Sequence, residues 1–459
     1  MKKIIKYSLC ISIVLTSFLS CSNDNNELFD ETPTERVNDK NAELLNLLLS
    51  QENGYKGVYF PKNDEYGGFT FYMKFNDDGT VKMTSDFNSQ TDIESSSYDV
   101  RLGTSTELVF TTRNHIHKLS NNLIGGLIGT GFEGTSVFQY ISNDNGTITF
   151  KDIRNDGTSS LVLEPTGFND FDTESIENVE KSRSQRANFI PSITNPVFQI
   201  LKIENGSGTT SFNLNYNLAK FHATPTFETI DGVINQFNFG IAFTNDGLTI
   251  SPSLDFEGEM YKDFIYDADA NSYVSQVNGT VATISFSNEP AYYTADVNNL
   301  AQLNTFAFFY IPALGASPLT SLAHDQMMEG VNGDLNTLGY TFQYYLLRID
   351  LEGDNCNTFL GLQAIRNSNG QEFRARYCFN PTIQDNKLFL EYTGPADNNS
   401  VFFESSMMPI IEFFSSAQGM VYVEEGSFNS STSSFTNSAS TFTSLDSPEK
   451  RVYGVWIPL

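Results

Sequence analysis

Large apolar residues alternate with small or polar residues through most of the chain, and turn residues interrupt the alternation at short intervals. The stretch Phe71–Gly79, FYMKFNDDG, has apolar residues at every second position and ends in Asn-Asp-Asp-Gly. A period of two predicts a half-buried strand, and the glycine can adopt the positive φ that a tight turn requires. Similar turns occur at 143–146, 155–157, 245–247 and 367–370. The pattern therefore predicts antiparallel hairpins and a mainly β protein.

Several of these segments occur twice in similar form. The nine residues Phe71–Gly79 match Phe239–Gly247, FGIAFTNDG, and Leu161–Gly167, LVLEPTG, matches Leu388–Gly394, LFLEYTG. The matches follow one order along the chain, as expected for a duplicated module with insertions. We therefore expect two related antiparallel β-lobes, barrel- or sandwich-like, with a few short helices. The alternative is coincidence in a chain rich in Phe, Asn and Gly.

The same pattern suggests a division of the chain. We expect a signal peptide at 1–20, a tether at 21–32, an N-terminal β-lobe with a leading helix at 33–168, a charged linker or solvated helix at 169–195, and a C-terminal β-lobe at 196–459.

The C-terminal lobe carries extra chain around 291–330, which is aromatic and apolar and includes a short helical pattern. An insertion into a repeat often lines the functional face of a fold, so a ligand site is expected there. The alternative is a helix that only closes an open end of the sheet.

The N-terminus has the features of an export signal. Lys2, Lys3 and Lys6 precede a short apolar run, which ends in Phe18-Leu19-Ser20-Cys21. The run is too short to cross a bilayer as a helix, and small residues before a cysteine resemble the lipobox of bacterial lipoproteins. Cys21 is therefore the expected lipidation site, with acyl chains such as palmitate as the anchor. The alternative is an ordinary cleaved leader.

Two cysteines remain after Cys10 of the leader and Cys21 are set aside. Cys356 and Cys378 lie on either side of the Asn367–Gly370 turn. In an exported protein we favour a disulfide between them, and the alternative is a pair of buried thiols.

The charge of the chain limits its partners. The sequence has 27 Lys and Arg against 55 Asp and Glu, a formal net charge of −28. Such a surface repels phosphate backbones, so nucleic-acid binding is disfavoured and a neutral or cationic ligand is expected.

Candidate chemistry is sparse. Asp255, Glu257 and Glu259 alternate in LDFEGEMY and would share one face of a strand. They are weak calcium candidates, a weaker acid/base pair for glycoside cleavage, and above all a typical solvated strand face. The sequence has no HExxH, GxSxG or P-loop motif, so no catalytic residue or cofactor is predicted.

Four stretches resemble the family called domain of unknown function 4302, uncharacterised lipoproteins of the Bacteroidota type. They are Phe29–Val37, Tyr66–Val81, Arg113–Ser120 and Phe138–Gly157. The resemblance implies a lipid-anchored outer-membrane protein, at the cell surface rather than on the periplasmic side, often encoded near nutrient-uptake pairs of the SusC/SusD kind.

Together these features predict a non-enzymatic, ligand-binding accessory of glycan or peptide uptake. A structural or adhesive envelope component is the alternative, and a glycoside hydrolase is less favoured.

Overall fold

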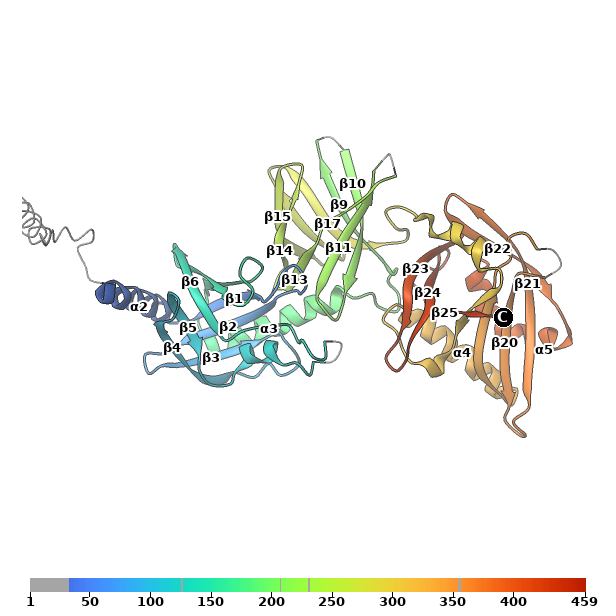
Figure 1. Cartoon of the computed structure of the whole chain (residues 1–459), viewed down its shortest axis with the longest axis horizontal. Helices are drawn as coiled ribbons and strands as arrows, with labels where there is room; N and C mark the ends of the chain where they lie inside the picture. The colour runs from blue at the N-terminus through green and yellow to red at the C-terminus, as the bar shows by residue number, and fades with distance from the viewer. Residues whose placement is uncertain (1–32, 125–126, 207, 230–231, 354–355) are drawn as a thin grey trace, which may run out of the picture.

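The computed structural model describes residues 33–124, 127–206, 208–229, 232–353 and 356–459. The leader, the tether and the expected lipidation site Cys21 lie outside these residues. Three β units follow one another along the long axis of the molecule (Figure 1). The prediction of a mainly β, antiparallel, barrel-like protein with a few helices is confirmed.

The first unit is a closed barrel of eight antiparallel strands in sequence order. Its strands are β1 (Tyr55–Phe60), β2 (Phe69–Phe75), β3 (Thr80–Ser85), β4 (Glu94–Leu102), β5 (Thr106–Phe110), β6 (Val137–Asp144), β7 (Thr147–Asp152) and β8 (Ser160–Pro165). The leading helix α2 (Pro33–Leu49) packs Leu44 and Leu48 into the core of this barrel. A short 3-10 helix, η1 (His115–Ser120), follows β5.

The second unit, the central sheet, has nine strands, and a pairing between β10 and β11 closes eight of them into a ring with β12 attached outside. They are β9 (Phe198–Asn205), β10 (Gly208–Asn217), β11 (His222–Glu228), β12 (Ile234–Gln236), β13 (Phe239–Phe243), β14 (Gly247–Phe256), β15 (Glu259–Asp267), β16 (Ser272–Val277) and β17 (Thr280–Ser287).

The third unit, the last barrel, is again eight strands in sequence order. They are β18 (Phe306–Tyr310), β19 (Tyr340–Arg348), β20 (Phe359–Arg366), β21 (Glu372–Gln384), β22 (Lys387–Pro395), β23 (Met420–Asn429), β24 (Ser434–Ser444) and β25 (Arg451–Pro458). The 3-10 helices η2 (Ala295–Leu303) and η3 (Pro312–Leu314) flank β18, α4 (Leu322–Thr337) precedes β19, and α5 (Asn398–Phe414) precedes β23.

The stretch 196–459, expected as one β-lobe, thus carries two separate sheets. The expected copy-to-copy correspondence does not hold either. Phe71–Phe75 lies in β2, the second strand of its barrel, whereas Phe239–Phe243 is β13, the fourth strand around the ring of the central sheet. An alternating strand followed by an Asn/Asp-Gly turn suits any hairpin, so similar sequences recur at places that are not equivalent.

The first barrel and the central sheet meet where β2 lies beside β13. The amide of Gly68 donates to the carbonyl of Ile241 at 3.1 Å, and the amide of Gly67 donates to the carbonyl of Lys220 at 2.8 Å. The Thr70 hydroxyl donates to the carbonyl of Phe243 at 2.6 Å. A Cβ on Gly67 would lie within 3.0 Å of the carbonyl oxygens of Phe221 and Ile241. We call this contact the glycine junction; it exists because Gly67 has no side chain.

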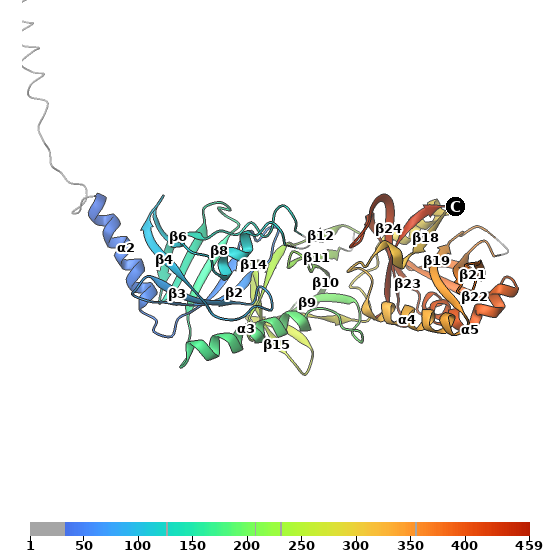
Figure 2. The ribbon, with the colours of Figure 1, turned by 90° about the horizontal axis from the view of Figure 1, so that it is seen from below.

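Helix α3 (Phe171–Asn188) covers the same junction from one side, and it runs beneath both units (Figure 2). The guanidinium of Arg186, near the end of α3, contacts the carboxylate of Asp86 at 3.0 Å and lies 4.7 Å from the centre of the Phe221 ring. Asp86 is fully buried and also accepts from the Thr70 amide at 3.0 Å. The segment expected as a linker is therefore a strap that joins the two units.

Substitution of Gly67 by Ala should disrupt the glycine junction, because the new methyl group has no room beside two carbonyl oxygens. We expect a loss of about 1–3 kcal/mol in the free energy of unfolding, measured by denaturant titration. Gly167→Ala is the matched control, since a Cβ there meets no atom within 4 Å. Equal stability of the two variants would contradict this account of the junction.

Burial raises the pKa of Asp86 to about 6, although the charge of Arg186 and a hydrogen bond from the Thr70 amide oppose the rise. The folded protein therefore keeps a proton on Asp86 at pH values where the unfolded chain, with the ordinary pKa of 3.8, has lost it. Protonated Asp86 therefore adds to the free energy of unfolding fully below the ordinary pKa of 3.8. This contribution is lost as the pH rises through the folded-state pKa of about 6.

We therefore compare wild type with the variant Asp86→Asn. When the pH falls from about 7 to about 5, the free energy of unfolding of wild type should rise by about 1 kcal/mol relative to that of the variant. Arg186 on α3 and Tyr72 on β2 are ionisable groups that interact with Asp86. Denaturant midpoints of both proteins at the two pH values give the difference. A relative loss for wild type at the lower pH would show that Asp86 is ionised in the fold.

Candidate functional site

The interior of the last barrel is filled, so a ligand must bind outside it. Phe308 packs inward against Phe442 and Trp456, at ring-centre distances of 4.9 and 5.9 Å. The indole nitrogen of Trp456 donates to the Ser440 hydroxyl at 3.0 Å. In a barrel of eight strands, side chains of this size occupy the whole interior.

The next residue along β18, Phe309, points outward, and the loop that follows β18 crosses the outer face of β24 and β25. Its Leu314 and Leu319 pack there in a second apolar cluster, separate from the barrel core, with Phe428, Tyr453 and Val455. The barrel therefore has apolar side chains on both faces in this region.

The turn between β23 and β24 holds this loop in place. The Thr432 hydroxyl donates to the carbonyl of Leu314 at 2.7 Å, and the Ser431 amide donates to the carbonyl of Ala316 at 2.9 Å. Gly315 between them has a φ of +96°, and a Cβ there would lie within 3.0 Å of the Thr432 hydroxyl. The loop is thus fixed by hydrogen bonds and by a position that favours glycine.

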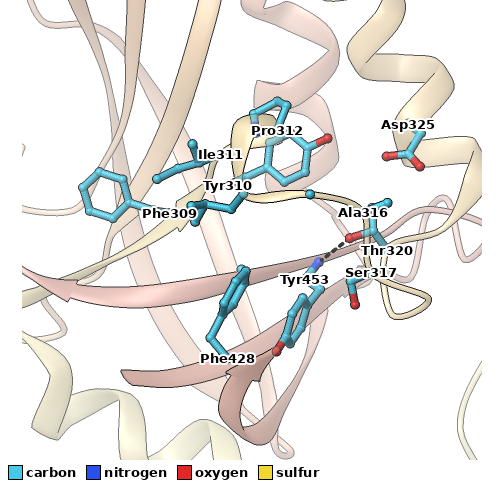
Figure 3. A pocket seen from close by; sticks show the side chains of 13 residues that line it. Phe309, Tyr310, Ile311, Pro312, Ala316, Ser317, Thr320, Asp325, Phe428 and Tyr453 are labelled. Atoms are coloured by element: carbon cyan, nitrogen blue, oxygen red, sulfur yellow. Dashed lines mark hydrogen bonds between the residues drawn. The ribbon is translucent and has the colours of Figure 1, made fainter. Parts of the chain in front are cut away.

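A cleft of about 210 Å³ lies between this loop and the barrel (Figure 3). Phe428 and Tyr453 form one wall, with their rings stacked 5.2 Å apart at an angle of 9°. Tyr310 lies across the cleft from them, and Asp325 reaches it from α4. The Tyr453 amide donates to the Thr320 hydroxyl at 3.2 Å, which ties the loop to β25. The cleft therefore combines aromatic walls with a few polar groups, as small-ligand sites do.

The cleft carries little charge. Asp325 is the one carboxylic acid among the described residues that line it. Partial burial raises the pKa of Asp325, and the nearby carboxylate of Glu329 adds to the rise. Burial also raises the pKa of the Tyr310 hydroxyl. The site suits a ligand that has hydroxyl or amide groups and an apolar face.

His324 supports the back of the cleft. It is fully buried, its Nε2 lies 3.0 Å from the Tyr345 hydroxyl, and its ring packs on Tyr310 at 4.9 Å. Burial, followed by the charge of Lys450, lowers the pKa of His324 to about 3. This histidine is neutral and positions two tyrosines.

A second hollow of about 370 Å³ lies between α4 and α5, at Met327, Pro409 and Lys450. It has one aromatic lining residue, Phe413, and two carboxylates, Glu412 and Asp446. It offers no stacked aromatic wall, so the cleft is the better candidate.

The structure places the sequence-predicted residues elsewhere. Asp255 and Glu257 are exposed on the β14–β15 hairpin of the central sheet, and Glu259 is half-buried there and accepts from the Asn278 amide nitrogen at 2.8 Å. In the part of the chain that the structure describes, no group of three or more His, Cys, Asp or Glu side chains is placed to hold a metal ion. The three carboxylates therefore do not surround one ion, and they line neither hollow.

Cys356 and Cys378 form a disulfide with a Cα separation of 4.8 Å. The bond ties the segment before β20 to β21 and lies apart from the cleft-lining residues.

The extra chain around 291–330 does line the cleft, but it is not an addition to a complete barrel. It supplies β18, which pairs with β19 and β25 and closes the ring.

Sequence reasoning missed the wall formed by Phe428 and Tyr453. The outward Phe residues of the Ser/Thr-rich segment 427–444 were its signal, but nothing local shows that β23 and β25 bring Phe428 and Tyr453 together.

In the described residues, no helix has the length and apolar character needed to cross a membrane.

Comparison with known proteins gives a family but no function. No curated protein matches the chain. A solved structure, that of the beta subunit from DNA polymerase of Streptococcus pyogenes, aligns with 91% of this chain and 98% of its own at 10% identity and a TM-score of 0.17. A score this low carries no argument about fold or function. The model of the family described as domain of unknown function (DUF4302) matches residues 25–268, more than half of the sequence. The chain belongs to the DUF4302 family.

Proposed function

We propose that this protein is a non-enzymatic, lipid-anchored accessory of nutrient uptake at the outer membrane, and that it binds an extended glycan in the cleft of the last barrel. The observation that carries the proposal is the cleft itself, in which the partly exposed rings of Phe309 and Tyr310 lie near polar groups of Thr320 and Asp325, above a buried wall of stacked Phe428 and Tyr453. Partly exposed aromatic rings can pack on the apolar faces of sugar rings, and the polar groups can hydrogen-bond to hydroxyls.

A glycan fits this site better than a peptide. Extended peptides commonly bind by adding a strand to a free sheet edge. β22 and β23 pair only at Leu388 and Met420, but β18 and β25, the strands beside the cleft, are each paired on both sides, so an added strand finds no edge next to them. Recognition must therefore use outward side chains, which the cleft provides.

The membrane anchor and the partners of the proposal rest on the sequence. The leader with Cys21 supports lipid anchoring, and cell-surface display beside a SusC/SusD-like transport pair would give a glycan-binding protein its role. A structural or adhesive envelope component is the alternative, and it would need no ligand in the cleft. Hydrolysis is less favoured, because the cleft offers Asp325 where glycosidases use two carboxylates.

Obstruction of the cleft should abolish glycan binding by the mature chain. Ala316 is exposed and lines the cleft, whereas Ala313 is exposed in the same loop and does not. After a glycan array has identified a ligand, we expect Ala316→Trp to weaken it by at least about tenfold in calorimetric titration, or about 1.4 kcal/mol. Ala313→Trp should stay within about twofold of wild type.

Silence of the whole array would favour the structural or adhesive alternative. Equal effects of the two Trp substitutions would place the ligand outside the cleft.

A further inference from the structure

We propose that the glycan carries carboxylate groups, and that its acidic units lie on an arginine-bearing face of the last barrel next to the cleft. This inference rests on the proposed function and names the chemical class of the ligand. It predicts a preference for uronic-acid glycans over neutral ones.

The face is defined by two rows of outward side chains across β19, β20 and β21. In one row Tyr344 pairs with Gln363 and Gln363 with Arg374, and in the other Leu346 pairs with Gly361 and Gly361 with Arg376. We call these six residues the arginine face.

The arginine face continues directly from the cleft. Phe309 lines the cleft, and its ring lies 5.4 Å from the ring of Tyr344. The Tyr344 hydroxyl donates to Gln363 Oε1 at 2.6 Å, and Arg374 Nε donates to the same oxygen at 3.2 Å. A chain of contacts therefore leads from the cleft to Arg374, and a ligand longer than the cleft would follow it.

The two arginines are available to an anion. The Arg374 side chain is 74% exposed, and its nearest carboxylate, Glu372, is 3.9 Å away and itself 56% exposed. An exposed pair at this distance contributes little. The Arg376 guanidinium lies 4.8 Å from the centre of the Phe359 ring, and within the described residues it has no ion-pair partner. Guanidinium groups bind carboxylates in a planar, two-bonded geometry.

Local charge outweighs the overall charge at this face. The chain has a formal charge of −28, which by itself would favour a neutral or cationic ligand. Exposed charges act over a Debye length of only about 8 Å at physiological salt. Arg374 and Arg376 lie two residues apart on β21, and among the described residues the one carboxylate within 4.0 Å of either guanidinium is that of Glu372. A ligand carboxylate beside both arginines therefore meets two positive charges and one exposed negative charge, although the molecule as a whole is acidic.

The test is calorimetric titration of the mature chain with oligogalacturonate and with the same oligosaccharide as its neutral methyl ester. We expect wild type to bind the acid form at least about tenfold more tightly, and added salt to reduce that preference. The double variant Arg374→Gln/Arg376→Gln should lose the preference and keep the affinity for the ester within about twofold. Lys387→Gln is the control, because it removes one positive charge from β22 outside the arginine face.

Each result bears on one claim. Equal binding of acid and ester by wild type, or equal losses of affinity for both in the double variant, would overturn the inference. The proposed function would still stand in that case if Ala316→Trp blocked the binding. If neither oligosaccharide bound, both would fail for this glycan class. Binding of an oligoglutamate peptide as tight as that of oligogalacturonate would overturn the assignment to a glycan.

Discussion

The glycine junction is the constraint on which the arrangement of the first two units depends. Main-chain bonds from Gly67 and Gly68 connect the barrel to the central sheet directly, without side chains as spacers. Backbones can approach this closely only where no Cβ intervenes. The strap α3 then adds Arg186, whose guanidinium lies between a buried carboxylate and the ring of Phe221. The family match over residues 25–268 includes this whole contact, so the junction belongs to the part of the chain that the family model describes.

The last barrel differs in how it uses its two faces. Its interior is closed by Trp456, Phe442 and the apolar face of α5, so it has no room for a ligand. Its outer face has a second apolar cluster, a loop fixed at Gly315, and two arginines on β21. Side chains on paired strands are held in more precise positions than side chains on loops. This barrel lies beyond the residues that the family model matches.

Local chemistry made part of this fold predictable. Alternating apolar residues and Asn/Asp-Gly turns indicated antiparallel strands, and Pro33 suits the first turn of the helix that begins there. Other features depend on contacts between distant residues. Nothing near Asp86 in the sequence shows that Arg186 will pair with it. The buried face of α3 includes the polar residues Ser175 and Ser182, so the helix has no continuous apolar stripe that would predict its packing. The count of β units depends on which strands close each ring, and the cleft depends on Phe428 meeting Tyr453. Strand periodicity contains no information about either pairing.

The central structural claim is that the first barrel and the central sheet form one body through the glycine junction. Hydrogen exchange of the mature chain, followed at single amides, tests this most directly. We expect the amides of Gly67 and Gly68 to exchange as slowly as those inside β2, because their partners lie on the other unit. Exchange as fast as that of the exposed turn at Asp77–Gly79 would show that the junction opens freely and would contradict the account.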